Sequence, residues 1–344
     1  MNAKTTAPMT AATTTSTLAP PARWRRAVVN HASWFPVAAS GLLLILLLVA
    51  AQIRFGSFVK PGVLSSLFVD NAFLIVLACG MTLVIITGGI DLSVGAVMAF
   101  SGIIAANLLQ NGVAPALVIP LMLINGAVFG LLIGVLVQYF NVQPFIASLA
   151  GMFLARGLAY VFAPRQITVS DAAVLSLNNH KFRSGAWYFT GTVIIAIVVV
   201  LIMAWLLART RFGRTVYAIG GSEQSAKLMG LPVARTKVLV YVISGTCAGI
   251  AGLIFTSYIS SGYSQHGVGT ELDTIAAVVI GGTLLTGGSG YIFGSLLGVL
   301  VYGVIKTVIN FAGFEQSWTR ISVGILLLAF VVVQRAIVAR ASRR

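Results

Sequence analysis

The stretch DNAFLIVLACGMTLVIITGGIDLSVGAVMAFSG, residues 70–102, decides the fold class of this chain. It contains two long apolar runs that meet at Thr87-Gly88-Gly89, and its interior holds one charged residue, Asp91. An apolar helix of about 20 residues crosses the hydrocarbon core of a bilayer, because each residue adds about 1.5 Å of rise. The two runs therefore predict membrane-spanning helices at about 66–87 and 92–109.

Composition extends this conclusion to the whole chain. Of 344 residues, 58% are hydrophobic and 8% are Asp, Glu, Lys or Arg, and the mean hydropathy is +0.99. A soluble domain carries about 25% charged residues, so a soluble globule is excluded, and a disordered chain is excluded by the high hydrophobic content. The formal charge of +15 would suggest nucleic acid as the partner of a soluble protein. In a membrane protein, the positions of the basic residues instead indicate which loops lie in the cytoplasm. No nucleic-acid partner is therefore expected.

The same reasoning along the chain predicts an all-α, polytopic helical membrane protein with about ten transmembrane segments. Eight segments would also agree with the distribution of charge. The segment at 273–286 is short and interrupted by Gly281-Gly282, which is typical of a broken or re-entrant segment. The expected segments are 35–53, 66–87, 92–109, 114–138, 144–163, 187–207, 237–258, 273–286, 291–310 and 318–337.

Basic residues gather near the N-terminus, in 208–237 and at the C-terminus. The positive-inside rule places all three stretches in the cytoplasm, and even numbers of expected spans separate them. The predicted parts of the chain are a disordered cytoplasmic tail and basic flank at 1–34, a transmembrane domain at 35–337 and a basic cytoplasmic tail at 338–344. Within the transmembrane domain, 164–186 is expected to be a periplasmic loop and 208–236 a cytoplasmic loop.

Two Thr-Gly-Gly triplets indicate an internal duplication. Thr87-Gly88-Gly89 is followed after five residues by Gly95, and Thr286-Gly287-Gly288 is followed by Gly294 at the same spacing. Transporter folds often contain such repeats. The alternative is that small residues simply let helices pack closely in lipid, and Gly makes up 36 residues of this chain. Both interpretations remain open at this point.

Polar residues inside apolar spans are costly unless they face a cavity, a partner or an interface. Asp91 lies at a Gly-rich break, where it suits an N-cap of the segment at 92–109 at least as well as a substrate contact. Arg156 is expected to snorkel or to pair with a carboxylate. Glu271 and Asp273 are expected at the outer mouth, where they can cap the segment that follows. The candidates for a substrate pathway are Asn71, Thr87, Asp91, Ser93, Asn107, Glu271 and Asp273.

The sequence lacks the motifs of common catalytic and metal sites. It contains no Gly-x-x-x-x-Gly-Lys-Ser/Thr, and therefore no P-loop for ATP, and no Gly-x-Ser-x-Gly or His-Glu-x-x-His. The three histidines are scattered, so neither a metal site nor catalytic residues are expected. Cys79 and Cys247 lie in apolar runs and are expected to be small buried thiols.

The cytoplasmic stretch 208–237 predicts a short helix. Ser222 can act as its N-cap, with Glu223 in the first turn and Lys227 in the last, and Gly230 suits the C-terminal cap. A helix of about two turns is unstable alone in water, so it must pack on something. It either rests on the membrane surface or docks a cytoplasmic partner. The apolar residues that it offers for contact are Ala226, Leu228 and Met229.

Three runs of sequence together resemble the permease subunits of bacterial ABC importers for monosaccharides, of the ribose, xylose, arabinose and galactofuranose type. They are residues 70–102, RTRFGRTVYAIGGSEQSAKLMGL at 209–231 and ELDTIAAVVIGGTLLTGGSGYIFGSLLGVL at 271–300. The likeness covers about residues 35–337. The closing stretch INFAGFEQSWTRISVGILLLAFVVVQR, at 309–335, is most similar to a galactofuranose-type permease.

The resemblance implies a multi-pass transport subunit of the bacterial inner membrane, with both termini in the cytoplasm and no ATPase site of its own. It implies no cofactor bound by this chain, since a separate cytoplasmic ABC ATPase subunit uses the ATP. A periplasmic sugar-binding protein would deliver the sugar, and a second permease copy or paralogue would complete a dimer surrounded by membrane lipid.

The run GGSEQSAKLMG, at 220–230, resembles the coupling segment of this family, whose helix fits a groove on the ATPase. The Ala226-to-Gly230 spacing is kept, whereas Glu223 stands one residue early and Ser222 replaces the usual Asn. The residues implied for contact with the ATPase are Gly221, Ser222, Glu223, Ala226, Leu228, Met229 and Gly230.

Two other function classes compete with an ATP-driven sugar importer. An ion-coupled secondary sugar transporter would place carboxylates near the midplane of the membrane, and Asp70 and Asp91 are expected at opposite span ends. An intramembrane enzyme acting on lipid-linked sugar would require clustered catalytic carboxylates or histidines. The identity of the sugar, galactofuranose included, and the choice between homodimer and heterodimer stay open.

Overall fold

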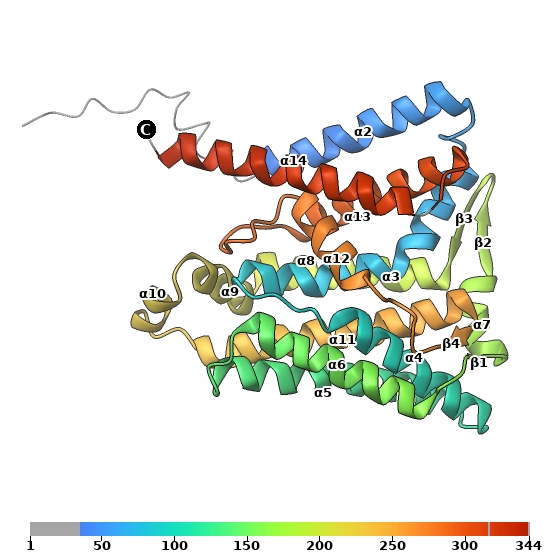
Figure 1. Cartoon of the computed structure of the whole chain (residues 1–344), viewed down its shortest axis with the longest axis horizontal. Coiled ribbons are helices and arrows are strands. Elements are labelled where there is room, and N and C mark those ends of the chain that lie inside the picture. The colour runs from blue at the N-terminus through green and yellow to red at the C-terminus, as the bar shows by residue number, and fades with distance from the viewer. Residues whose placement is uncertain (1–34, 316, 343–344) are drawn as a thin grey trace, which may run out of the picture. The chain divides into compact units, whose positions relative to one another are not determined.

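The computed structural model describes residues 35–315 and 317–342. The predicted N-terminal tail at 1–34 and the last two residues of the predicted C-terminal tail lie outside the described residues. Each of the ten expected segments corresponds to a helix (Figure 1). These helices are α2 (Phe35–Phe55), α3 (Pro61–Ile86), α4 (Val94–Gln110), α5 (Pro115–Gln138), α6 (Pro144–Phe162), α8 (Gly191–Arg209), α11 (Val233–Ile259), α12 (Thr270–Ile280), α13 (Ile292–Phe311) and α14 (Ser317–Ser342).

Seven of the described helices are long and apolar enough to cross a membrane, which confirms an all-α polytopic membrane protein. They are α2, α3, α5, α6, α8, α11 and α13. Helix α4 and the part of α14 up to Val332 are apolar but shorter. Helix α12 has 11 residues, or about 16 Å, roughly half of a bilayer core. The segment predicted at 273–286 is therefore short and ends at Gly281, as its two glycines indicated.

Proline explains where several of these helices begin. Pro61, Pro115 and Pro144 occupy the first turns of α3, α5 and α6. Proline is favoured there because the first backbone N–H groups of a helix have no partner within the helix. The starts of α5 and α6 agree with the predicted segments to within one residue, whereas α3 begins five residues earlier than predicted.

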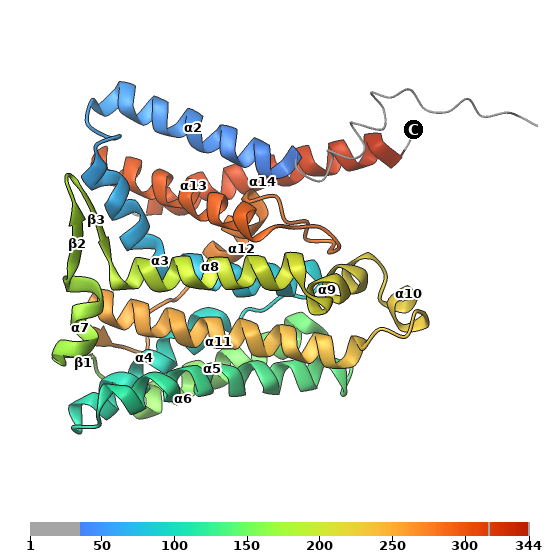
Figure 2. The same ribbon diagram turned by 180° about the vertical axis from the view of Figure 1, so that it is seen from behind.

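The core lies around α3 and α11. Helix α11 packs along α5, α3 and α4, and most of α3 is buried (Figures 1 and 2). Glycines allow α5 and α11 to come into backbone contact: a Cβ added at Gly126 would overlap the carbonyl of Gly245, and one at Gly130 would overlap the carbonyl of Tyr241. Some of the glycines of this chain therefore serve to let helices pack closely.

The predicted periplasmic loop at 164–186 contains folded elements. They are β1 (Ile167–Thr168), α7 (Ala172–Asn179) and β2 (Lys181–Ser184). Strand β2 forms an antiparallel hairpin with β3 (Trp187–Thr190), and β1 pairs with β4 (Ser261–Gly262). The segment predicted as a helix from residue 187 thus begins as a strand, and α8 begins at Gly191. Its residues Trp187, Tyr188 and Phe189 are good strand formers, which hydropathy alone does not reveal.

Two further helices occupy the predicted cytoplasmic loop, at the opposite end of the bundle from the β2–β3 hairpin (Figure 1). They are α9 (Arg211–Gly221) and α10 (Glu223–Leu228). Helix α9 was not predicted. It begins at the cap formed by Thr210, whose hydroxyl accepts a 3.2 Å hydrogen bond from the Gly213 backbone N–H. The two ends of the bundle are called here the α10 end and the hairpin end.

Candidate functional site

Helix α10 is held at both ends by caps that the sequence predicted. The backbone N–H of Ser225 donates to Ser222 Oγ at 3.2 Å, which confirms the N-cap. At the other end Gly230 has a φ of 73°, in the left-handed region that glycine adopts at low cost. The N–H groups of Gly230 and Leu231 donate to the carbonyls of Lys227 and Ala226 at 3.0 and 3.1 Å. These two bonds complete a Schellman motif.

The apolar residues of α10 point to two different sides. Ala226 is fully buried and packs with Ile219 of α9 and Val233 of α11. Leu228 and Met229 are instead 84% and 66% exposed. A six-residue helix has too few internal hydrogen bonds to be stable alone, so Ala226 anchors it. The two exposed side chains are free for contact with another molecule.

Glu223 is occupied within the chain. Its carboxylate pairs with Lys227 at 2.7 Å and with Lys237 of α11 at 2.9 Å. The hydrogen bond from Lys227 is the main cause that lowers the pKa of Glu223 below its usual value, and partial burial opposes this shift. Glu223 therefore ties α10 to the start of α11. The ATPase contact that the resemblance implies for Glu223 stays a prediction.

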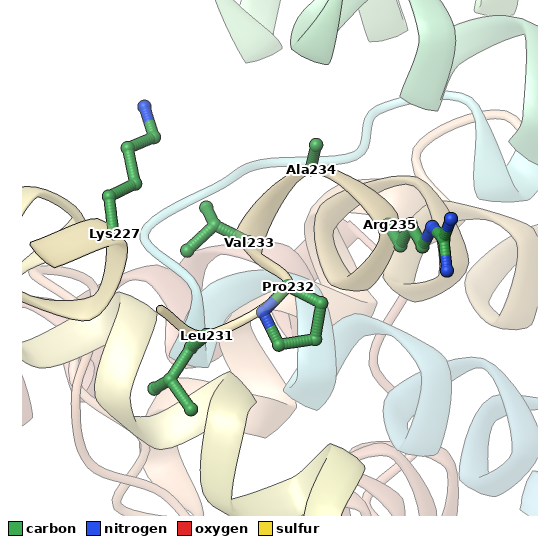
Figure 3. A pocket seen from close by; sticks show the side chains of 6 residues that line it. All are labelled: Lys227, Leu231, Pro232, Val233, Ala234 and Arg235. Carbon is green, nitrogen blue, oxygen red and sulfur yellow. The ribbon is translucent and has the colours of Figure 1, made fainter. Parts of the chain in front are cut away.

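A shallow depression lies where α10 meets α11 (Figure 3). Its volume is about 340 Å³, and in Figure 3 the basic side chains of Lys227 and Arg235 stand on opposite sides of it. Leu231 and Pro232 provide apolar surface between them. Two of its lining residues, Lys227 and Leu231, flank the exposed residues Leu228 and Met229 in the sequence. The α10 end therefore offers apolar and basic surface together. Its lining residues are Lys227, Leu231, Pro232, Val233, Ala234 and Arg235.

Behind α10, the backbone of α9 touches the end of α3, just before the first Thr-Gly-Gly triplet, and Gly288 of the second triplet. The N–H of Gly288 donates to the carbonyl of Ile86 at 2.9 Å, and this bond joins the loop after α12 to the end of α3. A Cβ at Gly220 would overlap Ile86 O and Gly288 N. The hydroxyl of Tyr217 donates to Gly290 O at 2.6 Å. We call Ile86, Gly88, Gly220, Gly287 and Gly288 the glycine junction.

The glycine junction connects the α10 end to the membrane helices. One Thr-Gly-Gly segment leads from α3 toward α4, and the other lies between α12 and α13. Sequence reasoning noted the two triplets but not their contact with each other or with α9. No local signal marked this contact, because Gly220 lies in the last turn of α9, a helix that was not predicted, and glycine is common at such helix ends.

Asp91 does not cap α4, so that expectation is wrong. Helix α4 begins at Val94, and Ser93 is the residue at its N-cap position. Asp91 is 1% exposed. Its Oδ1 accepts from the backbone N–H and the hydroxyl of Ser93 at 3.0 and 2.6 Å, and its Oδ2 accepts from Ser244 Oγ at 2.8 Å. Asp91 therefore joins the entrance of α4 to α11.

The other pathway candidates are spread over the bundle. Asn71 is buried and donates to Leu67 O, and Thr87 donates to Val84 O. Asn107 accepts a 3.0 Å bond from the Asn111 side chain. These bonds are local to each helix, and together with Asp91 and Ser93 they do not form one site.

Glu271 and Asp273 lie in the first turn of α12. Their place at the outer mouth stays a prediction. Glu271 accepts a 3.2 Å bond from Gly269 N, and Asp273 accepts one of 3.0 Å from the Tyr302 hydroxyl. The residue at the N-cap position itself is Gly269, which has no side chain for capping.

Arg156 forms no ion pair within 4.0 Å among the described residues, although it lies in electrostatic range of the Glu271 carboxylate. Its Nη1 donates to the carbonyls of Ser264 and His266, both at 2.6 Å, and so holds the loop before α12. Cys79 and Cys247 are buried free thiols, as their apolar surroundings predicted.

Comparison with known proteins decides the family. The model of the family described as "Branched-chain amino acid transport system / permease component" matches residues 63–331. The chain belongs to this permease family. The match runs from the start of α3 into α14 and includes α9, α10 and the glycine junction.

Curated members of the permease family are similar to the chain over nearly its whole length. The fructose import permease protein FruG of Bifidobacterium longum is 46% identical over 88% of this chain and 92% of its own. The inner membrane ABC transporter permease protein YjfF of Escherichia coli is 42% identical over 83% of this chain and 87% of its own. The ribose import permease protein RbsC of Bacillus subtilis is 40% identical over 85% and 90%, respectively. No solved structure matches the chain.

Proposed function

We propose that this protein is the membrane-spanning subunit of an ATP-driven importer that carries a monosaccharide across the bacterial inner membrane. A separate cytoplasmic ABC ATPase energises the transport, and a periplasmic binding protein delivers the sugar. The names of similar permeases, which include fructose and ribose importers, support this class of substrate. A second copy or paralogue of the chain completes the transport pathway.

The exposure of Leu228 and Met229 is the observation that supports ATPase docking at α10. Leu228, the last residue of α10, and Met229, its C-cap, are two adjacent exposed apolar side chains on a capped, anchored helix end, and contiguous exposed apolar surface is typical of protein contact sites. Basic residues on α8, α9, α10 and α11 surround this end. The positive-inside rule places them in the cytoplasm, where the ATPase would be.

The glycine junction supplies a route from the ATPase to the transport pathway. A movement of α10 is passed to α9 through the packing of Ala226 on Ile219. From Gly220 it reaches the segments before α4 and before α13 at the same time. Interfaces with such close backbone contact shift as units rather than deform gradually. The junction therefore suits a switch between two orientations of the membrane helices.

An ion-coupled mechanism finds less support in this geometry. Asp70 and Asp91 contact α11 at Tyr258 and Ser244, respectively. These two α11 positions are separated by about 21 Å along the helix at 1.5 Å per residue. The two carboxylates thus belong to opposite halves of the bundle and do not form one ion site.

The test is transport by proteoliposomes that contain the chain with the ATPase and binding protein encoded by neighbouring genes. We expect uptake of ribose, fructose or galactofuranose that requires ATP on the ATPase side and persists when an ionophore collapses the proton gradient. Uptake that continues without ATP and stops with the ionophore would refute the proposal. That galactofuranose is the transported sugar stays a prediction until uptake of these three sugars is compared.

Docking at α10 has its own test with a matched control. Leu228→Glu places a charge on the exposed tip, and Phe182→Glu places one on the β2–β3 hairpin, where Phe182 is 51% exposed. We expect the first variant to lose copurification of the ATPase and the second to keep it. Equal copurification in both variants would place the ATPase elsewhere.

A further inference from the structure

Six polar side chains from five helices gather in the hairpin half of the bundle. Tyr188 N of the hairpin donates to Ser65 Oγ of α3 at 3.1 Å, which marks this end of α3. Asp70 lies little more than one turn further along the same helix. The other members are placed near the end of α11, at the start of α12, in the last turns of α13 and at the start of α14. This polar cluster consists of Asp70, Tyr258, Asp273, Tyr302, Lys306 and Arg320.

Two pairs of tyrosine and aspartate form the frame of the polar cluster. The Tyr258 hydroxyl donates to Asp70 Oδ1 at 3.1 Å, and the Tyr302 hydroxyl donates to Asp273 Oδ2 at 3.0 Å. Lys306 is within electrostatic range of both carboxylates. It follows Tyr302 by four residues on α13, so the two side chains share one face of that helix.

The hydrogen-bonding capacity of the cluster is not used up within the chain. Among the described residues, no ion pair within 4.0 Å joins Lys306 or Arg320 to a carboxylate, although Arg320 is in electrostatic range of Asp273. The second oxygen of each of the two aspartates has no hydrogen-bond partner in the described part of the chain. A purely structural network would saturate these groups, because unpaired polar groups in apolar surroundings are costly.

The polar cluster lies at the margin of the packed core, to which its buried member Tyr302 belongs. Asp70, Asp273 and Lys306 are half-buried and Arg320 is exposed. Charged groups on membrane helices face a water-filled cavity or a partner, since contact with hydrocarbon is too costly. Two carboxylates oppose two cations, so the cluster has no formal net charge and favours neither an anion nor a cation.

We propose that the polar cluster binds the hydroxyl groups of a monosaccharide at the outer part of the transport pathway. The free carboxylate oxygens accept hydrogen bonds from sugar hydroxyls, and the lysine and the arginine donate to sugar oxygens. Each tyrosine hydroxyl donates its single hydrogen to an aspartate, so its oxygen can only accept from a sugar hydroxyl. A neutral polyol needs both kinds of partner and no net charge. This assignment rests on the proposed function, because it places the sugar that the importer carries.

The first experiment measures sugar imported per ATP hydrolysed by the reconstituted complex, with ribose and fructose as probes. Tyr258→Phe and Tyr302→Phe each remove one hydroxyl and keep the ring, and Tyr160→Phe on exposed α6 is the control. We expect a drop of about tenfold in the ratio for the cluster variants, the scale of losing one hydrogen bond to a charged group. ATPase activity stimulated by the binding protein should remain, whereas a structural role would lower both activities.

The second experiment asks whether water reaches the cluster. Both native cysteines are buried, so they give little background. We expect Lys306→Cys to react with a charged, membrane-impermeant methanethiosulfonate reagent, and Leu328→Cys, on the apolar surface of α14 and 67% exposed, to stay unreactive. Unreactive Lys306→Cys, or an unchanged ratio of sugar to ATP in both tyrosine variants of an importing complex, would overturn the assignment. A wild-type complex that imports none of ribose, fructose and galactofuranose with ATP would overturn the proposed function, and the assignment with it.

Discussion

Replacing Gly220 by alanine tests whether the glycine junction passes movement from α9 to the membrane helices. The added Cβ would overlap the Ile86 carbonyl oxygen and lie 2.9 Å from Gly288 Cα. Real Cβ atoms essentially never approach other atoms within 3.0 Å. Because all of these neighbours are backbone atoms, no side chain can rotate away, and α9 must separate from the junction by on the order of 1 Å.

The energy of this change is the balance of two terms. Alanine stabilises a helix by about 1 kcal/mol relative to glycine, while overpacking a close contact costs about 1–3 kcal/mol. We therefore expect the Gly220→Ala protein to lose up to about 2 kcal/mol of stability, which is too little to unfold a typical protein. The displaced α9 should still carry α10, so the ATPase should copurify normally.

Gly221→Ala is the matched control, because it lies next to Gly220 in α9 and its added Cβ would meet nothing within 4 Å. The assay is sugar import and ATP hydrolysis by the same proteoliposomes, with thermal unfolding of the purified complex beside it. We expect Gly220→Ala to hydrolyse ATP with several-fold less import, and Gly221→Ala to behave as wild type or to melt slightly higher. Equal ratios of import to hydrolysis in the two variants would refute a role of the junction in coupling.

Two further predictions concern charges near the ends of helices. The lowered pKa of Glu223 means that its ion pairs stabilise α10 above the usual pKa of glutamate, about 4.3, and that this stability is lost as pH falls through the lowered value. Amide-exchange protection of α10 should decrease in that acidic range in the wild type but not in Glu223→Gln; parallel curves would contradict this. Asp91→Ala should destabilise the chain by about 1–3 kcal/mol, because buried Ser244 loses its acceptor. Asp91→Asn should lose less, and a wild-type melting temperature for Asp91→Ala would argue against this link.

The sequence predicted the helices well because hydropathy acts locally. All ten expected segments became helices, and Ser222 and Gly230 cap α10 as their residue types indicated. Predictions failed where a local sequence pattern was compatible with more than one structure. The run from Trp187 is apolar enough for a membrane helix yet pairs with β2 as a strand, and Asp91 suited a cap yet turns toward α11.

By itself, the sequence determined that this chain crosses a membrane many times, because so few charges cannot cover a soluble surface and the runs have the length of a bilayer. Only the tertiary structure decided which polar groups act together. It brought Gly220 against Ile86 and Gly288, and it placed Lys306 in electrostatic range of two aspartates whose helices are far apart in the sequence. Such contacts depend on how helices pack against each other, and the local sequence around each residue does not show which distant part of the chain it will meet.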